Sequence, residues 1–218
     1  MINDTVSDCL KQLNWQHLTA WLSKRLSEKR TSHCLGVQQK ATELATRMGL
    51  PDWQVVQAGL AGLLHDCAKE MPVPDLQEAV NTYGVSVSTE DLLHIQTLHA
   101  FVGAAIAEKE LNIDDPVVLD AMRYHTTGRP EMSVVEKIVF IADKIEENTR
   151  DPQLTKEISR LIHPEDIQSL DSALMALYTR TVAYLTLRGF GIHPRTQAAI
   201  TALETQTHSP QSHSHCLQ

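Results

Sequence analysis

The chain lacks several features that mark common classes of protein. It has no apolar run of the roughly eighteen residues that a transmembrane helix needs. Residues 1–13 lack the basic region and long apolar run of a secretory signal. Its 4 cysteines are scattered without a CxxC pair, which argues against a zinc ribbon or a disulfide framework. We therefore expect a cytoplasmic protein without a membrane partner.

Positive charge is also scarce. The chain carries 27 acidic and 19 basic residues, for a formal net charge of −8. General nucleic-acid binders usually present a basic face, so we expect no nucleic-acid partner. A small polyphosphate substrate remains compatible with this charge, because bound metal ions can supply local positive charge.

The apolar pattern predicts an all-α fold with a single domain. At 218 residues and 42% apolar content, the chain can bury one substantial core. Apolar residues recur at helical spacing in most segments. The predicted helices are residues 6–26 (one helix or a broken pair), 33–48, 52–68, 74–83, 99–111, 115–125, 134–147, 154–162, 164–187 and 194–203. Residues 84–88 are expected to form a loop.

Polar residues at the expected helix starts predict the N-caps. They are Ser32, Asp52, Ser88 or Thr89, Asp115 followed by Pro116, and Ser133. Residues 1–20 form a predicted helical extension packed on the core, with a homodimer contact as the alternative. Residues 21–190 form the main domain and residues 191–204 a C-terminal helix. The polar, His-rich residues 205–218 are expected to be disordered.

The central stretch of the sequence is His65-Asp66, which directly follows the apolar run of residues 58–64. Adjacent residues cannot share a helix face, so the two side chains can reach different metal ions or different edges of one. A carboxylate beside an imidazole in a dry pocket is costly unless another charge compensates it. Divalent cations would provide that charge.

Six candidate metal ligands are spread over five predicted helices. They are His33, His65, Asp66, His99, His125 and Asp143. Imidazole and carboxylate ligands without thiolate favour iron, manganese or zinc in a catalytic rather than a structural site. Six ligands exceed the number that one catalytic zinc takes, so they suit two metals with a bridging carboxylate, for which Asp66 is the natural candidate.

Each ligand candidate also has an ordinary structural explanation. An isolated histidine is usually solvated or hydrogen-bonded, and we interpret His94, His163 and His193 in this way. Asp143 differs because it interrupts the apolar run of residues 138–142, and a buried aspartate needs a partner. A salt bridge would satisfy Asp143 as well as a metal would. The prediction of a metal site therefore rests on the set of six residues and not on any one of them.

These residues resemble the H…HD…D pattern of the HD-domain metal-dependent phosphohydrolases. Further blocks resemble the bacterial YqeK-type branch of that superfamily, the symmetrical diadenosine tetraphosphatases. The blocks are residues 30–33 with Val37, 65–69, 98–100 with Gly103, 121–130 and 141–146. The resemblance covers about residues 20–190. The HD pair alone is a weak signal, whereas the Tyr-His-Thr-Thr-Gly-Arg-Pro block of residues 124–130 is more specific.

The resemblance implies an HD-domain helical bundle that holds two divalent metal ions, most often iron. His33, His65, Asp66 and Asp143 would hold one ion, and Asp66 would bridge to a second ion held by His99 and His125. The implied reaction splits diadenosine tetraphosphate, a dinucleoside polyphosphate, into two ADP by means of a metal-activated water.

The resemblance also suggests which residues contact the substrate. Lys69 and Arg129 would stabilise charge on the phosphates, and Asp66 could relay protons besides bridging the metals. Thr127 and the backbone of Gly128 would add hydrogen bonds. Arg150 and Asn148 are weaker candidates for contacts with phosphate or nucleoside.

Two other functions compete with this one. The first is hydrolysis of another phosphate ester, such as a nucleoside monophosphate or a cyclic dinucleotide. The second is a nucleotide sensor that uses the metal pocket without turnover. The complete ligand set argues against the sensor, and the block of residues 126–130 argues against other substrates.

Overall fold

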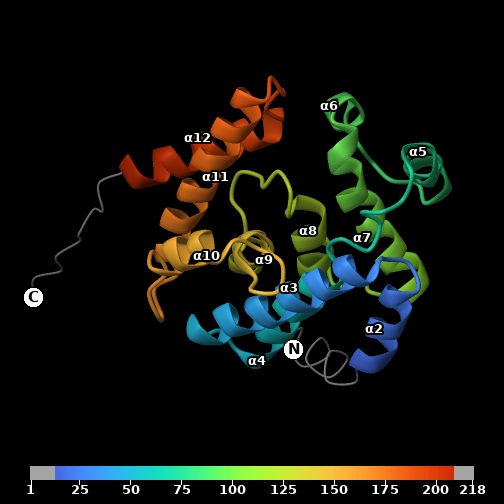
Figure 1. Cartoon of the computed structure of the whole chain (residues 1–218), viewed down its shortest axis with the longest axis horizontal. Coiled ribbons are helices and arrows are strands. Elements are labelled where there is room, and N and C mark those ends of the chain that lie inside the picture. Colours follow the sequence, from blue (N-terminus) through green and yellow to red (C-terminus); the bar gives the residue numbers. More distant parts are fainter. Residues whose placement is uncertain (1–12, 209–218) are drawn as a thin grey trace, which may run out of the picture.

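The structure is a computed structural model that describes residues 13–208. This part of the chain is built from helices without any strand (Figure 1), which confirms the all-α prediction. The α-helices are α2 (Trp15–Ser23), α3 (Glu28–Arg47), α4 (Asp52–Leu64), α5 (Val73–Thr82), α6 (Thr89–Leu93), α7 (Leu98–Leu111), α8 (Pro116–Tyr124), α9 (Val134–Ile145), α10 (Pro152–Ser159), α11 (Ser169–Leu187) and α12 (Pro194–His208). A 3-10 turn, η1 (Ile95–Thr97), precedes α7. Among residues 13–208, none of these helices combines the length and apolarity that crossing a bilayer requires.

Four helices form the centre of the bundle. Helix α3 packs along α4 and α9, while α8 contacts α4, α7 and α9. Their inward faces are fully buried at Leu60, Leu63 and Ile138. The same apolar cluster includes Leu22 of α2 and Leu203 of α12, so the described parts of both chain ends pack on this core. The divisions at residues 20 and 190 remain predictions, and residues 1–12 and 209–218 lie outside the described residues.

The helix starts agree with the sequence in most places. Ser88 and Ser133 each form a capping box with the acidic residue three positions later. Asp115 caps α8 ahead of Pro116, as predicted. Two caps were predicted wrongly: Ser27, not Ser32, caps α3, and Pro51 precedes α4, whose first residue is Asp52. Residues 27–32 contain no apolar side chain, so periodicity gave no signal for the first turn of α3.

Several helix ends also differ from the prediction. Helix α4 ends at Leu64 rather than at residue 68, and α9 ends at Ile145 rather than at residue 147. Helix α11 begins at Ser169 instead of residue 164. Helix α12 continues through His208, beyond the predicted start of disorder at residue 205. Its polar last turn lacks apolar periodicity, and the next helix-stopping signal in the sequence is Pro210.

Candidate metal centre

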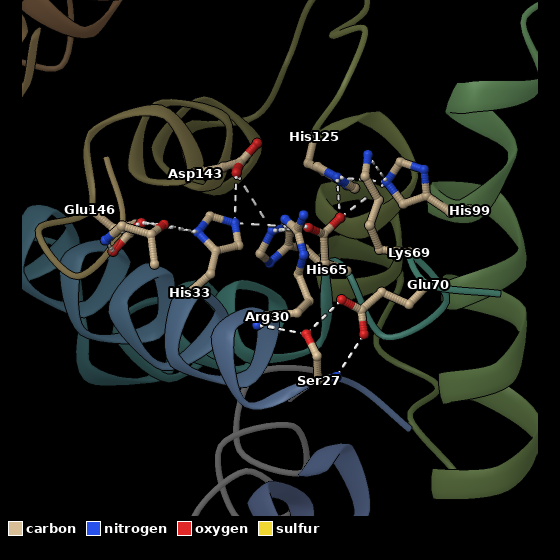
Figure 2. A network of polar contacts seen from close by, with 12 residues as sticks. Ser27, Arg30, His33, His65, Lys69, Glu70, His99, His125, Asp143 and Glu146 are labelled. Carbon is tan, nitrogen blue, oxygen red and sulfur yellow. Dashed lines mark hydrogen bonds and ion pairs between the residues drawn. The ribbon is translucent and has the colours of Figure 1, made fainter. Parts of the chain in front are cut away.

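The six predicted ligands converge in the middle of the bundle. His33 projects from α3, His99 from α7 and Asp143 from α9, and His125 is the C-cap residue that follows α8. All six side chains are buried, including the adjacent His65 and Asp66. Figure 2 shows the imidazoles of the four histidines directed toward one another between the helices.

The end of α4 positions the HD pair. Residues 57–64 are buried, so the last turns of the helix are enclosed by the core. His65 is its C-cap, and the chain then continues in short turns, with the amide of Lys69 donating to the carbonyl of Asp66 at 2.9 Å. His65 keeps helical backbone angles, and from the turns that begin there both side chains reach the centre.

The two oxygens of Asp66 face two different groups of histidines. Oδ2 lies 3.8 Å from Nε2 of His33 and 3.5 Å from Nε2 of His65. Oδ1 lies 3.1 Å from Nε2 of His99 and 3.4 Å from Nε2 of His125. One carboxylate therefore joins two clusters of nitrogen ligands, which is the arrangement of a bridging ligand.

Asp143 completes the first of these clusters. Its Oδ1 lies 3.0 Å from Nε2 of His33 and 3.6 Å from Nε2 of His65. Two groups of three ligand atoms lie close enough for shared metal coordination: His33, His65 and Asp143, and His65, Asp66 and His125. His65 belongs to both groups, which places it between the two clusters.

Backbone carbonyls fix three of the four imidazoles. Nδ1 of His65, His99 and His125 lies 2.7, 2.8 and 2.7 Å, respectively, from the carbonyl oxygen of the residue three positions earlier. A carbonyl only accepts hydrogen bonds, so Nδ1–H donates and the lone pair of Nε2 points into the centre. This is the tautomer that a histidine needs as a metal ligand through Nε2.

His33 has a different partner. Its Nδ1 lies 3.0 Å from Oε1 of Glu146, a fully buried carboxylate at the end of α9. The backbone amides of Asn148 and Thr149 donate to the same carboxylate at 2.6 and 3.1 Å, which compensates its charge. Gly36 leaves the space for it, because a Cβ added there would lie 2.4 Å from Oε2 of Glu146.

The hydrogen-bonding pattern leaves acceptors facing acceptors. Among residues 13–208, neither Nε2 of His65 nor Oδ1 of Asp66 has a hydrogen-bond partner, although both are buried. Nε2 of His99 lies 3.3 Å from Nε2 of His125, with both Nδ1 atoms already used as donors. Buried acceptors without donors are costly, and cations among them would remove that cost. The residues therefore fit a centre for divalent metal ions.

The electrostatic potential at the centre is strongly negative. Burial alone would lower the pKa of His65, but the carboxylates of Asp66 and Asp143 raise it to about 9. A divalent cation would compete with that proton for the same potential. Burial lowers the pKa of His125 to about 3 and also lowers that of His99. These two imidazoles are therefore neutral at physiological pH, as metal coordination requires.

Four basic side chains surround the ligands. Nη1 of Arg30 lies 2.9 Å from Oδ2 of Asp66, and Nη2 of Arg150 lies 2.6 Å from Oδ1 of Asp143. Lys144 donates to the other oxygen of Asp143. Nζ of Lys69 lies 3.4 Å from Nε2 of His99, and burial lowers its pKa. Arg30, Lys144 and Glu146 were not among the predicted site residues.

The block of residues 127–129 has mainly structural partners. The Arg129 guanidinium donates to Glu136 at 2.7 Å and to Asp120 at 3.1 Å, and it stacks on the Tyr124 ring. The Thr127 hydroxyl donates to the carbonyl of Gly128. Gly128 has φ 65°, the left-handed region that favours glycine. Their predicted substrate contacts are therefore not preformed, whereas Arg150 is already beside Asp143.

A histidine outside the centre shows the ordinary alternative. His193 is buried, with Nε2 3.1 Å from Oδ1 of Asp91, and Arg195 binds the same carboxylate. Among the described residues it joins no group with metal-ligand spacing. The prediction that His193 is a hydrogen-bonded structural residue is confirmed.

Comparisons with known proteins agree with this geometry. The HD domain family model matches residues 30–148, more than half of the chain and all six candidate ligands. The chain belongs to the HD-domain family. It is 34% identical over 180 residues to a Halalkalibacterium halodurans protein named bis(5'-nucleosyl)-tetraphosphatase, symmetrical, and the match covers 82% of this chain and 90% of that protein. A Bacillus subtilis protein with the same name is 32% identical over 84% of this chain and 94% of its own length.

A solved structure confirms the HD-domain fold. A Clostridium acetobutylicum protein, described as a predicted HD superfamily hydrolase involved in NAD metabolism, superposes with a TM-score of 0.80 at 33% sequence identity. The match covers 89% of this chain and 98% of that protein. The helical-bundle prediction is therefore confirmed, and the membership of the chain in an HD-domain branch with these hydrolases is established over most of its length.

Proposed function

We propose that this protein hydrolyses diadenosine tetraphosphate symmetrically and releases two molecules of ADP. The observation that carries the proposal is the position of Asp66, whose two oxygens face two separate groups of buried histidines. The names of the relatives matched over most of this chain supply the substrate class and the bond that is cleaved.

The proposal assigns two divalent metal ions to the centre. His33, His65, Asp66 and Asp143 would hold one, and Asp66 would share the second with His99 and His125. Iron is the expected metal, and manganese or zinc would suit the same ligands. When bound, such a pair of ions polarises phosphate oxygens and lowers the pKa of water, which provides the nucleophile at neutral pH.

The side chains around the ligands would bind the tetraphosphate. Arg30, Lys69, Lys144 and Arg150 bring four positive charges to the rim of the centre, on a chain whose formal net charge is −8. Such cations stabilise the charge that develops on transferred and departing phosphates. Lys69 is assigned to a phosphate beside His99, and its partial burial strengthens the interaction.

Arg129, Thr127 and Gly128 remain predicted substrate contacts. For Arg129 to bind phosphate, its guanidinium would have to leave Glu136 or Asp120. Asp66, as the bridging ligand, would join the two groups of metal ligands. The departing ADP is a stable anion that needs little help from a general acid. The proposed chemistry therefore depends mainly on positioning and positive charge.

The test begins with anaerobic purification, metal analysis, and incubation with diadenosine tetraphosphate. The products are separated by ion-exchange chromatography. We expect about two metal ions per chain and ADP as the sole nucleotide product, with His99→Ala and His125→Ala inactive. ATP plus AMP would refute symmetrical cleavage. Binding of the dinucleotide without turnover would identify a sensor, and turnover of mononucleotides or cyclic dinucleotides alone would refute the assigned substrate.

Other features of the proposal remain predictions. They are the homodimer, the cytoplasmic location, and the absence of nucleic-acid and membrane partners. Sedimentation of the purified full chain would test the first of these.

A further inference from the structure

A groove of about 350 Å³ lies between the C-terminal end of α9 and helices α10 and α11. Figure 1 shows α10 and α11 on the side of α9 away from α7. The walls of the groove include Lys144, Arg150, Leu154, Leu177, Arg180 and Tyr184. The proposed function as described so far uses only the first two of these side chains.

The groove begins at the metal centre. Lys144 and Arg150 line it, and both donate to the carboxylate of Asp143. Nη2 of Arg150 also lies 3.4 Å from Nε2 of His33. The same two cations therefore belong to the rim of the centre and to the wall of the groove, so the groove lies directly beside the metal centre.

The charged side chains that line the groove are all positive. Lys144, Arg150 and Arg180 line it, and no carboxylate is among the lining residues that the structure describes. The nearest acidic partner of Arg180 is the exposed Glu157, at 3.2 Å. An exposed pair of this kind contributes little and exchanges readily with a better anion. Three cations in one groove of an acidic chain favour a polyanionic ligand.

The outer part of the groove is apolar and aromatic. Leu154 and Leu177 supply aliphatic wall, and Tyr184 is 55% exposed. Aromatic residues make up only 5% of the chain, and among the described residues Tyr184 and Phe190 are the large exposed aromatics. An exposed ring beside cations is the combination that stacks on a nucleobase while charged groups hold the phosphates.

We propose that this groove binds one nucleoside diphosphate half of the dinucleoside substrate. The inference rests on the proposed function, because symmetrical cleavage requires a nucleoside diphosphate on each side of the scissile bond. The phosphates lie along Arg150 and Arg180, and the base stacks on Tyr184. The volume of about 350 Å³ is within the range of small-molecule sites.

The test measures ADP binding to the full chain by calorimetry, with and without added metal. Arg180→Ala and Tyr184→Ala are the test variants, since neither residue contacts a metal ligand. Each is expected to raise the Kd for ADP about tenfold, the effect of losing one stacked base or one phosphate contact. Tyr184→Phe keeps the ring and should bind ADP as the wild type does.

Matched controls separate the groove from the general surface. Arg160→Ala removes an exposed arginine outside the groove, the residue that follows α10, and Phe190→Ala removes a similarly exposed aromatic ring. Both should leave the Kd for ADP unchanged. Pyrophosphate serves as the probe without a base: its binding should weaken in Arg180→Ala and stay unchanged in Tyr184→Ala.

The outcomes distinguish this inference from the proposed function. If the wild type cleaves diadenosine tetraphosphate but Arg180→Ala and Tyr184→Ala bind ADP normally, the assignment of the groove is wrong and the proposed function stands. Wild-type protein that does not cleave the dinucleotide, yet binds ADP through both residues, supports the groove and refutes the function. No ADP binding by the wild type overturns the groove. Raised KM with kcat within about twofold in both variants supports both.

Discussion

Replacing Gly36 by alanine should weaken metal binding without touching a ligand. Gly36 lies on α3 one turn after His33, and its added Cβ would lie 2.4 Å from Oε2 of Glu146 and 3.0 Å from Nδ2 of Asn148. The carboxylate therefore has to move by about 1 Å to reach an ordinary contact distance of about 3.4 Å. We expect that shift to lengthen or break the 3.0 Å hydrogen bond between Oε1 of the same carboxylate and Nδ1 of His33.

The expected effects follow from these contacts. Losing a buried, charge-assisted hydrogen bond costs about 1.5–3 kcal/mol, and alanine in place of helical glycine returns about 1 kcal/mol. The free energy of unfolding of the metal-free chain should therefore fall by only about 0.5–2 kcal/mol. Loss of a carboxylate that orients a ligand histidine typically lowers metal affinity about 10–100-fold. Metal affinity should thus respond more strongly than stability.

The assay is competition for Zn²⁺ between the full chain and a chromophoric chelator. Glu146→Gln is the conservative variant, because its amide oxygen can still accept from His33, and it should lose less affinity than Glu146→Ala. If Gly36 acts through Glu146, the double variant Gly36→Ala/Glu146→Ala should bind Zn²⁺ no more weakly than Glu146→Ala. Affinity of Gly36→Ala within twofold of wild type, or additive effects in the double variant, would refute the reasoning.

Three further outcomes follow from other contacts. Gly128→Ala should lower the free energy of unfolding by about 2–4 kcal/mol in urea titrations, because φ is 65° and the new Cβ would lie 1.7 Å from the Tyr178 hydroxyl. Adding Tyr178→Phe should restore part of the lost stability, and no recovery would contradict the steric argument. Burial alone would raise the pKa of Asp91, but its hydrogen bonds with Arg195 lower that pKa well below its usual range. Asp91→Asn should therefore lower the free energy of unfolding by about 2 kcal/mol above about pH 4 and by progressively less at lower pH. A loss of stability that is independent of pH would refute this. Chelation of the metals should lower the Tm of the wild type, and by a smaller amount in His99→Ala, as differential scanning fluorimetry can measure.

The ligand set was predictable because its members break local rules. Asp143 interrupts an apolar run on a face that is buried, and His65-Asp66 ends a helix segment with no other polar residue after Gln57. A carboxylate or imidazole at such a position requires a partner, and the sequence offers six that can satisfy one another. Local rules describe single helices, however, and the distances between the six ligands depend on how five helices pack.

The helix boundaries near the centre were harder to predict for a related reason. Residues 65–69 continue a helix-compatible pattern, so periodicity extends α4 to residue 68. The helix in fact ends at Leu64, and the chain continues in short turns from which His65 and Asp66 both face inward. The cost of ending the helix is offset by interactions with α3, α7, α8 and α9, none of which a window of neighbouring residues contains.

Glu146 shows what kind of residue sequence reasoning misses. It stands one turn after Asp143, but an acidic residue at the end of a predicted helix is normally expected to be exposed to solvent. Its burial follows from Gly36, 110 positions earlier, which leaves room for the carboxylate on the facing helix. A glycine within the predicted helix of residues 33–48, three residues after a candidate ligand, was the available signal.

Arg129 shows the opposite limit. Its position after His125 and a glycine turn predicts a phosphate contact, and the resemblance strengthens that prediction. In the fold, however, Glu136 holds the guanidinium through two hydrogen bonds of 2.7 and 3.0 Å while Glu136 also completes the capping box of α9. Releasing Arg129 toward a phosphate would leave the buried carboxylate of Glu136 with only backbone partners. Arg150 and Lys144 avoid this cost, because a bound metal would take their place as the partner of Asp143. The cations already beside metal ligands are therefore better placed than Arg129 to bind the tetraphosphate.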